Sequence, residues 1–372
     1  MASFTNRGTK KKPSWQFTVS RMVNGKSKPI RKGGFKTKKE AEAAAREVEL
    51  MLQKGVHPDL RDYAFDEYFE SWIKAYKTDI SDNTLARYKD TLRTIEEYFQ
   101  GVSIKKINKR SYQEFLNEYG KTHAKSSTQK LNTHIRACVK DAIDEGIIAV
   151  DFTRGAKISG TPSKPKHEKH LNYEESKKLL KRLYELDKKT PTHYLLILGL
   201  TSGMRFGEMV GLTRKDFDFK NNTITINKTW GYTKQMHEGF GPTKNPQSNR
   251  TIKMDIKTMN LFKKYFEETP DNILRLVFYS PHSKYKVVTN NTANKALKYH
   301  LEQMKIKTIS VHGLRHTHAS VSLYEGASIH YISERLGHET IDTTLREYTH
   351  VIRELRLRDE EKISNIFGKM YV

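Results

Sequence analysis

The 372-residue sequence contains a single cysteine, Cys138, and no long apolar run. One cysteine cannot form a disulfide within the chain, and it excludes a zinc module built on several cysteines. The longest apolar run, residues 194–200, is far shorter than the ~18 residues that a membrane span requires. No apolar signal-peptide core stands at the start, so we expect a protein that stays in the cytosol and away from membranes.

Acidic residues are also scarce, because 43 Asp and Glu face 67 Lys and Arg, which gives a formal net charge of +24. Lysines and arginines that neutralise phosphates release condensed counterions, so this charge favours a nucleic-acid partner. The alternatives are a general gain in solubility, or a ribosomal or membrane-surface role. The excess is concentrated in residues 1–39, which hold twelve Lys or Arg and no acidic residue.

Residues 1–56 predict a small basic sheet followed by a helix. The expected elements are a disordered basic lead over 7–13, a strand over 15–22, an Asn24-Gly25 hairpin turn, a second strand over 28–31 ended by Gly33-Gly34, and a helix over 38–52. Thr37 stands where a helix cap is preferred. The alternative is a mere positively charged extension.

Residues 60–155 predict a domain of four helices. Apolar residues recur at spacings of three and four in four successive stretches, 65–76, 85–99, 112–119 and 131–143. Because the aromatic residues keep this helical period, they favour a core over base stacking. The interleaved Lys and Arg either contact phosphate or form a solvated face, and the sequence leaves both open.

A basic linker over 156–170, with Gly160 and Pro162, leads to a third domain over 171–350. Its expected elements are a helix opened by the Asn172/Glu175 capping box, an apolar helix from Pro191 to near Thr201, strands over 223–227 and 248–253, and helices from Asp255 onward. The fold class predicted for the whole chain is multidomain and mainly α with small β-sheets, the third domain being α+β.

Nucleotide and metal chemistry find little support in the sequence. It contains no phosphate-binding Gly-x-x-x-x-Gly-Lys loop and no dinucleotide-binding glycine fingerprint. His312, His316 and His318 form the one dense histidine cluster, but the fixed charge of Arg315 among them opposes a cation. We therefore expect no metal and no cofactor.

Arginine in this cluster suits an anionic ligand instead. A guanidinium binds phosphate with two parallel hydrogen bonds and keeps its proton, so it suits an oxyanion whose charge grows during a reaction. A second arginine, Arg205, lies between Gly203 and Gly207 directly after the apolar helix. Glycines on both sides of an arginine fit a tight site where the backbone approaches its ligand.

Four motifs in order resemble those of the tyrosine recombinases. They are Gly203-x-Arg205-x-Gly207-Glu208, His312-x-x-Arg315-His316, Leu336-Gly337-His338, and Tyr348 ten residues farther on. The wider layout resembles the phage and conjugative-transposon integrases of low-GC Gram-positive bacteria. The motifs cover residues 201–350, whereas the resemblance upstream rests on pattern alone.

The resemblance implies a role for each motif residue. Tyr348 would attack a DNA phosphodiester, forming a 3′-phosphotyrosyl link and a free 5′-hydroxyl without ATP or metal. Arg205 and Arg315 would clamp the non-bridging oxygens, and His312 and His338 would donate hydrogen bonds or assist proton transfer. A positive site is expected to favour the phenolate of Tyr348. The alternative is a tyrosine that merely packs in a helix.

The resemblance also implies a lysine that protonates the leaving 5′ oxygen. Lys244 stands at the matching place in the loop between the two predicted strands, with Lys228, Lys234 and Lys253 as rivals. We expect Glu208 to orient Arg205 or to stabilise the fold rather than to react, and His316 to be a structural or supporting residue. His318 receives no role.

The resemblance predicts a site-specific DNA recombinase of the bacterial cytoplasm that integrates and excises a mobile element. The predicted segments are an arm-type DNA-binding domain over 1–56, a core-binding domain over 60–155, the linker, the catalytic domain over 171–350, and a tail over 351–372 for protomer contacts. The expected partners are double-stranded attachment sites, a homotetramer on DNA, and an excisionase or host DNA-bending protein. The alternatives are a type IB-like topoisomerase and a catalytically idle DNA-binding regulator.

Overall fold

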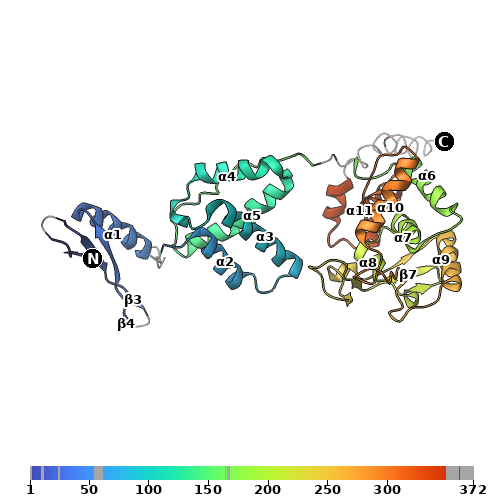
Figure 1. The fold of residues 1–372 in the computed structure, drawn as a ribbon, viewed down its shortest axis with the longest axis horizontal. Coiled ribbons are helices and arrows are strands. Elements are labelled where there is room, and N and C mark those ends of the chain that lie inside the picture. The colour runs from blue at the N-terminus through green and yellow to red at the C-terminus, as the bar shows by residue number, and fades with distance from the viewer. Residues whose placement is uncertain are drawn as a thin grey trace, which may run out of the picture. The chain divides into compact units, whose positions relative to one another are not determined.

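The computed structural model describes residues 2–9, 12–23, 26–53, 62–163, 165, 168–348 and 360. They fall into two compact units, Met1–Ser163 and Lys164–Val372, which are described separately (Figure 1). Among these residues no helix combines the length and apolar character needed to cross a membrane.

The first unit begins with a three-stranded antiparallel sheet in the order β1 (Ala2–Asn6), β2 (Trp15–Val19) and β5 (Ile30–Phe35). Helix α1 (Lys38–Gln53) covers one face of this sheet (Figure 1). The buried side chains of Phe17, Val19 and Ile30 pack with Ala45 and Val48 of α1. An amphipathic helix and one sheet face thus bury each other.

The sequence did not predict β1, and it ended the last strand of the sheet at residue 31, before the end of β5. β1 pairs with β2 from Ala2 opposite Val19 to Asn6 opposite Trp15, and β5 runs through Gly33-Gly34 to Phe35. β1 is a short edge strand with few apolar residues, so its alternation is weak. A further short pair joins β3 (Met22–Val23) to β4 (Lys26–Ser27), while the predicted turn at Asn24-Gly25 lies outside the described residues.

The four predicted helices of the first unit are confirmed. They are α2 (Phe65–Tyr76), α3 (Asp82–Phe99), α4 (Lys109–Thr122) and α5 (Lys125–Asp144), with a short 3-10 turn, η1 (Ile104–Lys106), before α4. Phe65, Phe69, Trp72, Tyr112 and Phe115 are all buried in one core, which confirms the packing role predicted for the aromatic residues.

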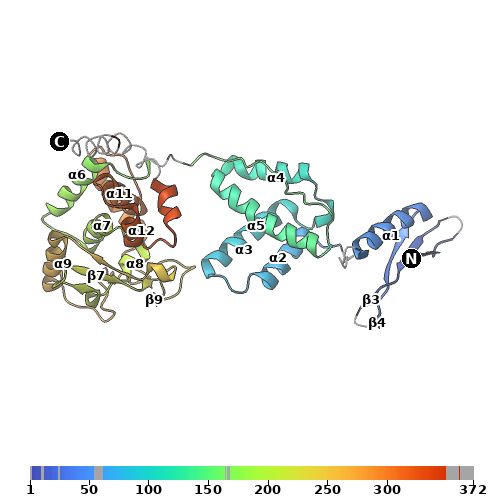
Figure 2. The ribbon, with the colours of Figure 1, turned by 180° about the vertical axis from the view of Figure 1, so that it is seen from behind.

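The second unit is mainly helical and also contains two small sheets (Figure 2). Its helices are α6 (Tyr173–Tyr184), α7 (Pro191–Ser202), α8 (Phe206–Val210), α9 (Ile256–Glu268), α10 (Asn290–Gln303), α11 (Val311–Tyr324) and α12 (Ile329–Leu336). Its strands are β6 (Phe217–Asp218), β7 (Thr223–Ile226) and β10 (Arg250–Lys253), in the order β10-β7-β6, and the β8 (Thr229–Trp230) and β9 (Phe240–Gly241) hairpin. Helix α7 is apolar all round and packs against α6, α10 and α11.

Local sequence signals set where these helices begin and end. Asn172 and Glu175 form the predicted capping box at the start of α6, and Pro191 is the first residue of α7. Gly203 ends α7 in the left-handed conformation at φ 70°, which glycine adopts without steric cost. The chain therefore turns sharply just before Arg205.

The predicted strand over 248–253 begins two residues later than expected. Residues Pro246–Ser248 form a 3-10 turn, η4, and β10 starts only at Arg250. Proline at 246 has no amide hydrogen for a strand ladder, which favours a turn here. The turn directs Ser248 into the interior, where its exposed fraction is 0%.

Helical residues 341–348 end the continuous described stretch of the second unit. The tail predicted to carry an apolar face for protomer contacts, residues 351–372, lies outside the described residues except for Glu360.

Candidate active site

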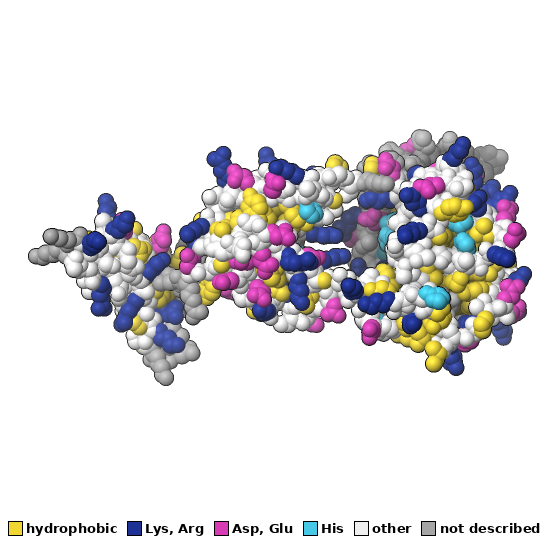
Figure 3. Space-filling view, viewed as in Figure 1, with side chains coloured by type: hydrophobic (Ala, Val, Ile, Leu, Met, Phe, Trp, Pro, Cys, Tyr) yellow, Lys and Arg dark blue, Asp and Glu magenta, His cyan; other side chains and the backbone are white. Residues whose placement is uncertain are grey.

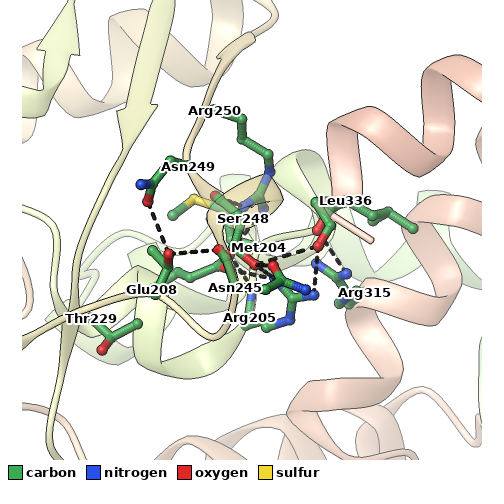
Figure 4. Close-up of polar contacts among 12 residues, drawn as sticks. Met204, Arg205, Glu208, Thr229, Asn245, Ser248, Asn249, Arg250, Arg315 and Leu336 are labelled. Carbon is green, nitrogen blue, oxygen red and sulfur yellow. Dashed lines mark hydrogen bonds and ion pairs between the residues drawn. The ribbon is translucent and has the colours of Figure 1, made fainter. Parts of the chain in front are cut away.

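Three arginines from three separate elements meet at the end of α12 (Figure 4). The carbonyl of Arg335 accepts from Arg250 Nε at 2.6 Å, that of Leu336 from Arg315 Nη2 at 2.8 Å, and that of Gly337 from Arg205 Nη2 at 2.8 Å. We call these three carbonyls the α12 terminus. The last carbonyls of a helix lack helical partners and carry partial negative charge, so they suit guanidinium donors.

Arg205 is also fixed from the other side. Its Nη1 donates to Glu208 Oε1 at 2.7 Å and to the hydroxyl of Ser248 at 3.0 Å. Glu208 also closes the N-terminal cap of α8 by accepting from the backbone amide of Arg205 at 3.0 Å. These contacts are those expected of a carboxylate that orients Arg205, and that role stays a prediction.

Glu208 is a buried carboxylate, 1% exposed, between two guanidiniums. Its Oε2 accepts from Arg250 Nη2 at 2.9 Å, opposite the bond to Arg205. Burial by itself would raise the pKa of Glu208, but the charges and hydrogen bonds of Arg250 and Arg205 outweigh it and hold that pKa below its usual range. The carboxylate is therefore ionised at neutral pH.

Arg315, on α11, is 3% exposed. Its Nη1 donates to the carbonyl of Gly203 at 2.8 Å, so it ties the turn before Arg205 to the α12 terminus. Burial, and next the charge of Arg205, lower the pKa of Arg315 to about 9. It still carries its charge at neutral pH.

One turn of α11 presents His312 and His316 together. Their rings meet edge to face with centroids 4.8 Å apart, and His316 Nδ1 shares a hydrogen bond of 3.0 Å with the hydroxyl of Tyr348. Loss of hydration and the charges of Arg315 and Arg205 lower the pKa of His312, although its side chain reaches solvent. Burial, and next the charge of His312, lower the pKa of His316 to about 4.

Tyr348 is 2% exposed and packs among Ala319, Leu323, Ile332 and Leu336. The prediction of a site that favours its phenolate is wrong for this structure. Burial raises the pKa of the Tyr348 phenol, and the opposing charge of Arg315 does not cancel that effect. The phenol is thus protonated in the free protein and held by His316.

His338 follows the α12 terminus directly. Gly337 ends α12 in the left-handed conformation at φ 65°, and His338 Nδ1 shares a hydrogen bond of 2.7 Å with the hydroxyl of Thr344. Burial, and next the charge of Arg315, lower the pKa of His338 to about 3. The imidazole is neutral and oriented by a residue of the segment that carries Tyr348.

Lys244 is exposed in the loop between β9 and β10. Its neighbours hold this loop in place, because Thr243 donates to Asn249 Oδ1 at 2.9 Å and the hydroxyl of Ser248 donates to Asn245 Oδ1. The structure thus places the backbone of Lys244 one residue from the Arg205 network, while its ammonium group contacts none of the other candidate residues in the described part of the chain. Among its rivals, Lys228 forms an ion pair of 2.5 Å with Asp216.

His318 belongs to the framework of the site. Its Nδ1 bonds to the carbonyl of Leu200 at 3.0 Å and its Nε2 accepts from Arg335 Nε at 2.9 Å. Across the described ranges, no group of three or more His, Cys, Asp or Glu side chains is arranged to hold a metal ion. The side chains that meet here are cationic and fit an anion.

Comparison with known proteins decides the family. Residues 169–354 match the family model of the phage integrase family, and this match covers half of the chain. The chain belongs to the phage integrase family. Residues 64–119 match the phage integrase N-terminal SAM-like domain, and residues 4–52 match an arm DNA-binding domain.

Similar proteins are tyrosine recombinases. A XerC-like tyrosine recombinase of Caldanaerobacter subterraneus subsp. tengcongensis is 26% identical, with 99% of this chain and 100% of the relative covered. The integrase of Staphylococcus phage L54a is 27% identical, with 81% and 91% covered. This chain is therefore a tyrosine recombinase of the integrase type, and neither relative favours a topoisomerase or an idle regulator.

The fold of this recombinase also matches a solved integrase. The Tn1549 transposon integrase (residues 82–397), in complex with transposon right-end DNA, superimposes with a TM-score of 0.68 at 17% identity. The match covers 81% of this chain and 100% of that one. The mainly helical fold class with small sheets is confirmed.

Sequence reasoning missed Ser248 and Arg250 as residues of this site. Both stood in a stretch assigned to a strand, where a serine and an arginine indicate only polar positions. Arg250 reaches its partners at Glu208 and Arg335, which lie 42 and 85 residues away in the sequence. The sequence offers one signal for these two residues. Ser248-Asn249-Arg250 is a polar stretch that directly follows the loop carrying Lys244.

Proposed function

We propose that this tyrosine recombinase cuts and rejoins DNA at attachment sites to integrate and excise a mobile element, with Tyr348 as its nucleophile. The carrying observation is that Arg205 and Arg315 are both fixed to the α12 terminus, while Tyr348 contacts the same helix that supplies Arg315. The likeness to a phage integrase and to a transposon integrase solved with DNA supports a mobile element as the substrate.

The two arginines are proposed to hold the scissile phosphate. The contacts above use three of the five N–H groups of Arg205 and two of those of Arg315, counted within the described residues. The remaining donors can face the non-bridging oxygens, where charge grows in the transition state. Because both guanidiniums are already fixed by the protein, they need little reorganisation during the reaction.

In the proposed cleavage step, Tyr348 Oη attacks phosphorus and the bond to the 5′ oxygen breaks. Since burial raises the pKa of Tyr348, the phenol must give up its proton as it attacks. Two neutral imidazoles are placed to receive or share that proton. His316 contacts the phenol, and His312 packs against His316. His338 would donate to the phosphate.

Lys244 is our candidate for the acid that protonates the leaving 5′ oxygen. The anchoring of Thr243 and Asn245 supports this role, since it fixes the loop while leaving the lysine side chain exposed. The pairing of Lys228 with Asp216 supports Lys244 over this rival.

The proposed partner is double-stranded DNA along the whole chain. On the face drawn in Figure 3, Lys and Arg side chains occur over both units, and Arg31 and Lys32 of β5 are exposed. We assign residues 1–56 to arm-type sites and 60–155 to the core site, because phosphate contacts position a protein on DNA. The reaction would then take place in the bacterial cytoplasm.

Strand exchange breaks four strands, and one Tyr348 serves one strand at a time. We therefore propose a homotetramer on two sites, with the tail over 351–372 as the candidate for protomer contacts in a closed ring. An excisionase or a host DNA-bending protein would act as an accessory partner. Sedimentation with both sites present measures the assembly, and a dimer that recombines fully would contradict it.

Trapping on a nicked suicide substrate tests the nucleophile. Tyr348→Phe should bind DNA and form no covalent complex on a denaturing gel. Tyr265→Phe is the matched control, because Tyr265 is also buried and donates to a carbonyl, that of Val277, at 3.2 Å. Covalent DNA on the Tyr348→Phe protein would overturn the proposal.

A further inference from the structure

Arg250 makes more contacts at the site than its place on a short strand suggests. It is 8% exposed, and its Nη2 donates to Glu208 Oε2 at 2.9 Å. Its Nε donates to the carbonyl of Arg335 at 2.6 Å and its Nη1 to that of Ser248 at 2.7 Å. One guanidinium thus joins β10, α8 and α12.

Arg250 and Arg205 donate to two of the same residues, Glu208 and Ser248, and their carbonyl partners at the α12 terminus, Arg335 and Gly337, stand two positions apart. Glu208 binds Arg205 Nη1, and the carbonyl of Gly337 binds Arg205 Nη2. Arg250 therefore lies one contact behind Arg205 at Glu208 and at Ser248. It also holds the end of the helix that leads into His338.

Gly337 provides an independent sign that this packing is tight. A Cβ at position 337 would lie 2.9 Å from Arg250 Nη1 and 3.0 Å from Ser248 Cα. Both distances are shorter than ordinary van der Waals contact, and φ at this position is +65°. A side chain there would displace the guanidinium of Arg250 from the α12 terminus.

We propose that Arg250 is a positioning residue of the recombination reaction, which keeps Glu208 and the α12 terminus in register so that Arg205 and His338 face one phosphate. The inference rests on the proposed function, since it assigns Arg205 to that phosphate. Lysine cannot take over this role, because a single ammonium cannot reach along the three directions of the guanidinium fork.

Single-turnover cleavage of a suicide substrate measures the effect. Arg250→Lys should slow cleavage at saturating DNA by about 30-fold, since a displacement of ~1 Å in a catalytic group costs up to about 100-fold. The DNA dissociation constant should change by less than about threefold, because Arg250 is placed behind the DNA-contacting groups. Equal losses in binding and in rate would contradict a positioning role.

Arg214→Lys is the matched control for a purely structural arginine. Arg214 likewise donates to two carbonyls, those of Phe266 at 2.9 Å and Thr269 at 2.5 Å, and forms an ion pair of 3.7 Å with Asp271. It should lower the unfolding temperature without slowing cleavage by the folded protein. If it slows cleavage as much as Arg250→Lys does, the effect of Arg250 is general destabilisation.

A double-mutant cycle tests whether Arg250 acts through Arg205. In an Arg205→Lys background, Arg250→Lys should slow cleavage by less than about threefold, because the group that it positions is already lost. Independent, multiplying losses would overturn the inference. A wild-type protein that forms no covalent complex would instead overturn the proposed function, so the two failures are distinguishable.

A second variant keeps the inference testable if Arg250→Lys does not fold. Gly337→Ala retains every charge and pushes the guanidinium aside, and it should slow cleavage by about tenfold. Gly101→Ala matches its backbone strain, because Gly101 has φ +68° and open space around it. Equal cleavage by Gly337→Ala and Gly101→Ala would overturn the inference.

Discussion

The helical core of the first unit and the arginine site of the second unit satisfy buried polar groups in opposite ways. In the helical core, neutral donors meet carboxylates: Trp72 Nε1 donates to Asp141 at 2.7 Å, and Tyr68 donates to Glu145 at 2.9 Å. At the α12 terminus, three guanidiniums are held by one carboxylate, a hydroxyl and neutral carbonyls.

This difference distinguishes a polar network for stability from one prepared for a ligand. Arg205, Arg250 and Arg315 carry two positive charges beyond the one that Glu208 balances. Buried positive charge without a counter-ion is unfavourable. A phosphodiester supplies one of the two missing negative charges, and the second develops in the transition state. In the helical core, Asp141 and Glu145 are only partly buried, so solvent stabilises their charge and these polar pairs need no charged ligand.

The largest effect is expected from Arg315→Met. Cleavage should fall by about 10³-fold, because removing even one oxyanion donor costs about 10²–10³. The unfolding temperature should fall by about 4–8 °C, because the buried carbonyls of Gly203 and Leu336 lose their donor. Suicide-substrate cleavage and thermal unfolding measure the two quantities. A collapse of the fold with no separate loss of rate would make Arg315 a structural residue.

Glu208→Gln should lower both rate and stability. The amide keeps the shape but removes the carboxylate between Arg205 and Arg250, so about 3 kcal/mol of unfolding free energy should be lost. Cleavage should fall by about 10–100-fold, because Arg205 loses one of its anchors. Urea unfolding and single-turnover cleavage of the same preparation check this, and Glu268→Gln, in the exposed ion pair with Lys264, is the control. Unchanged unfolding in Glu208→Gln would show that the two guanidiniums do not need the carboxylate.

Trp72→Phe should show the reverse pattern. The substitution removes the hydrogen bond to Asp141 and reduces the buried apolar surface. The free energy of unfolding should therefore fall by about 2 kcal/mol. Cleavage at saturating DNA should stay within about threefold of the wild type, because no charge at the site changes. A selective loss of cleavage by a stably folded Trp72→Phe protein would mean that the two networks are not independent.

The smallest effect is a difference in pH dependence between the two regions. Burial lowers the pKa of His316 to about 4 and those of His318 and His338 to about 3, whereas an unfolded histidine titrates near ~6.5. Above pH ~6.5 these imidazoles are neutral in both states, and the folded protein keeps its full stability. As the pH falls below ~6.5, the unfolded chain takes up protons before the folded protein does, so the free energy of unfolding decreases. In the helical core, burial lowers the pKa of a single histidine, His134, among the described residues.

Hydrogen exchange measured between pH 7.5 and 5.5 resolves this contrast by segment. Protection of α11 should fall more steeply than protection of α5. His318→Gln, which can still donate to Leu200 and accept from Arg335, should reduce the slope in α11. Equal slopes in both helices would show that the buried imidazoles do not set the acid sensitivity of the site.

Most of the helices and the order of the motifs could be predicted from the sequence, because both depend on residues that are close together in the chain. The apolar period of residues 65–76 and the caps at Asn172 and Pro191 are short-range signals, and the structure confirms all three. Edge strand β1 was missed, because a strand with few apolar residues becomes visible only through its pairing with β2.

The candidate site was less predictable where its properties depend on tertiary contacts. A motif points to Tyr348, but the buried apolar cluster around it decides its protonation and reversed the expected direction. Arg250 carried no motif at all, since its role arises from partners on α8 and α12. Sequence thus indicated the residues that meet the substrate better than the residues behind them.

Identification of the residue joined to DNA tests the central claim most directly. The wild-type protein, trapped on a suicide substrate and digested with trypsin, should yield a nucleotide-bearing peptide over residues 347–353, with the phosphate on Tyr348 and a free 5′-hydroxyl on the released strand. The link should be to the 3′ phosphate of the cleaved strand. DNA attached to any other residue, such as the exposed Tyr331 of α12, or a free 3′-hydroxyl on the released strand, would contradict the account.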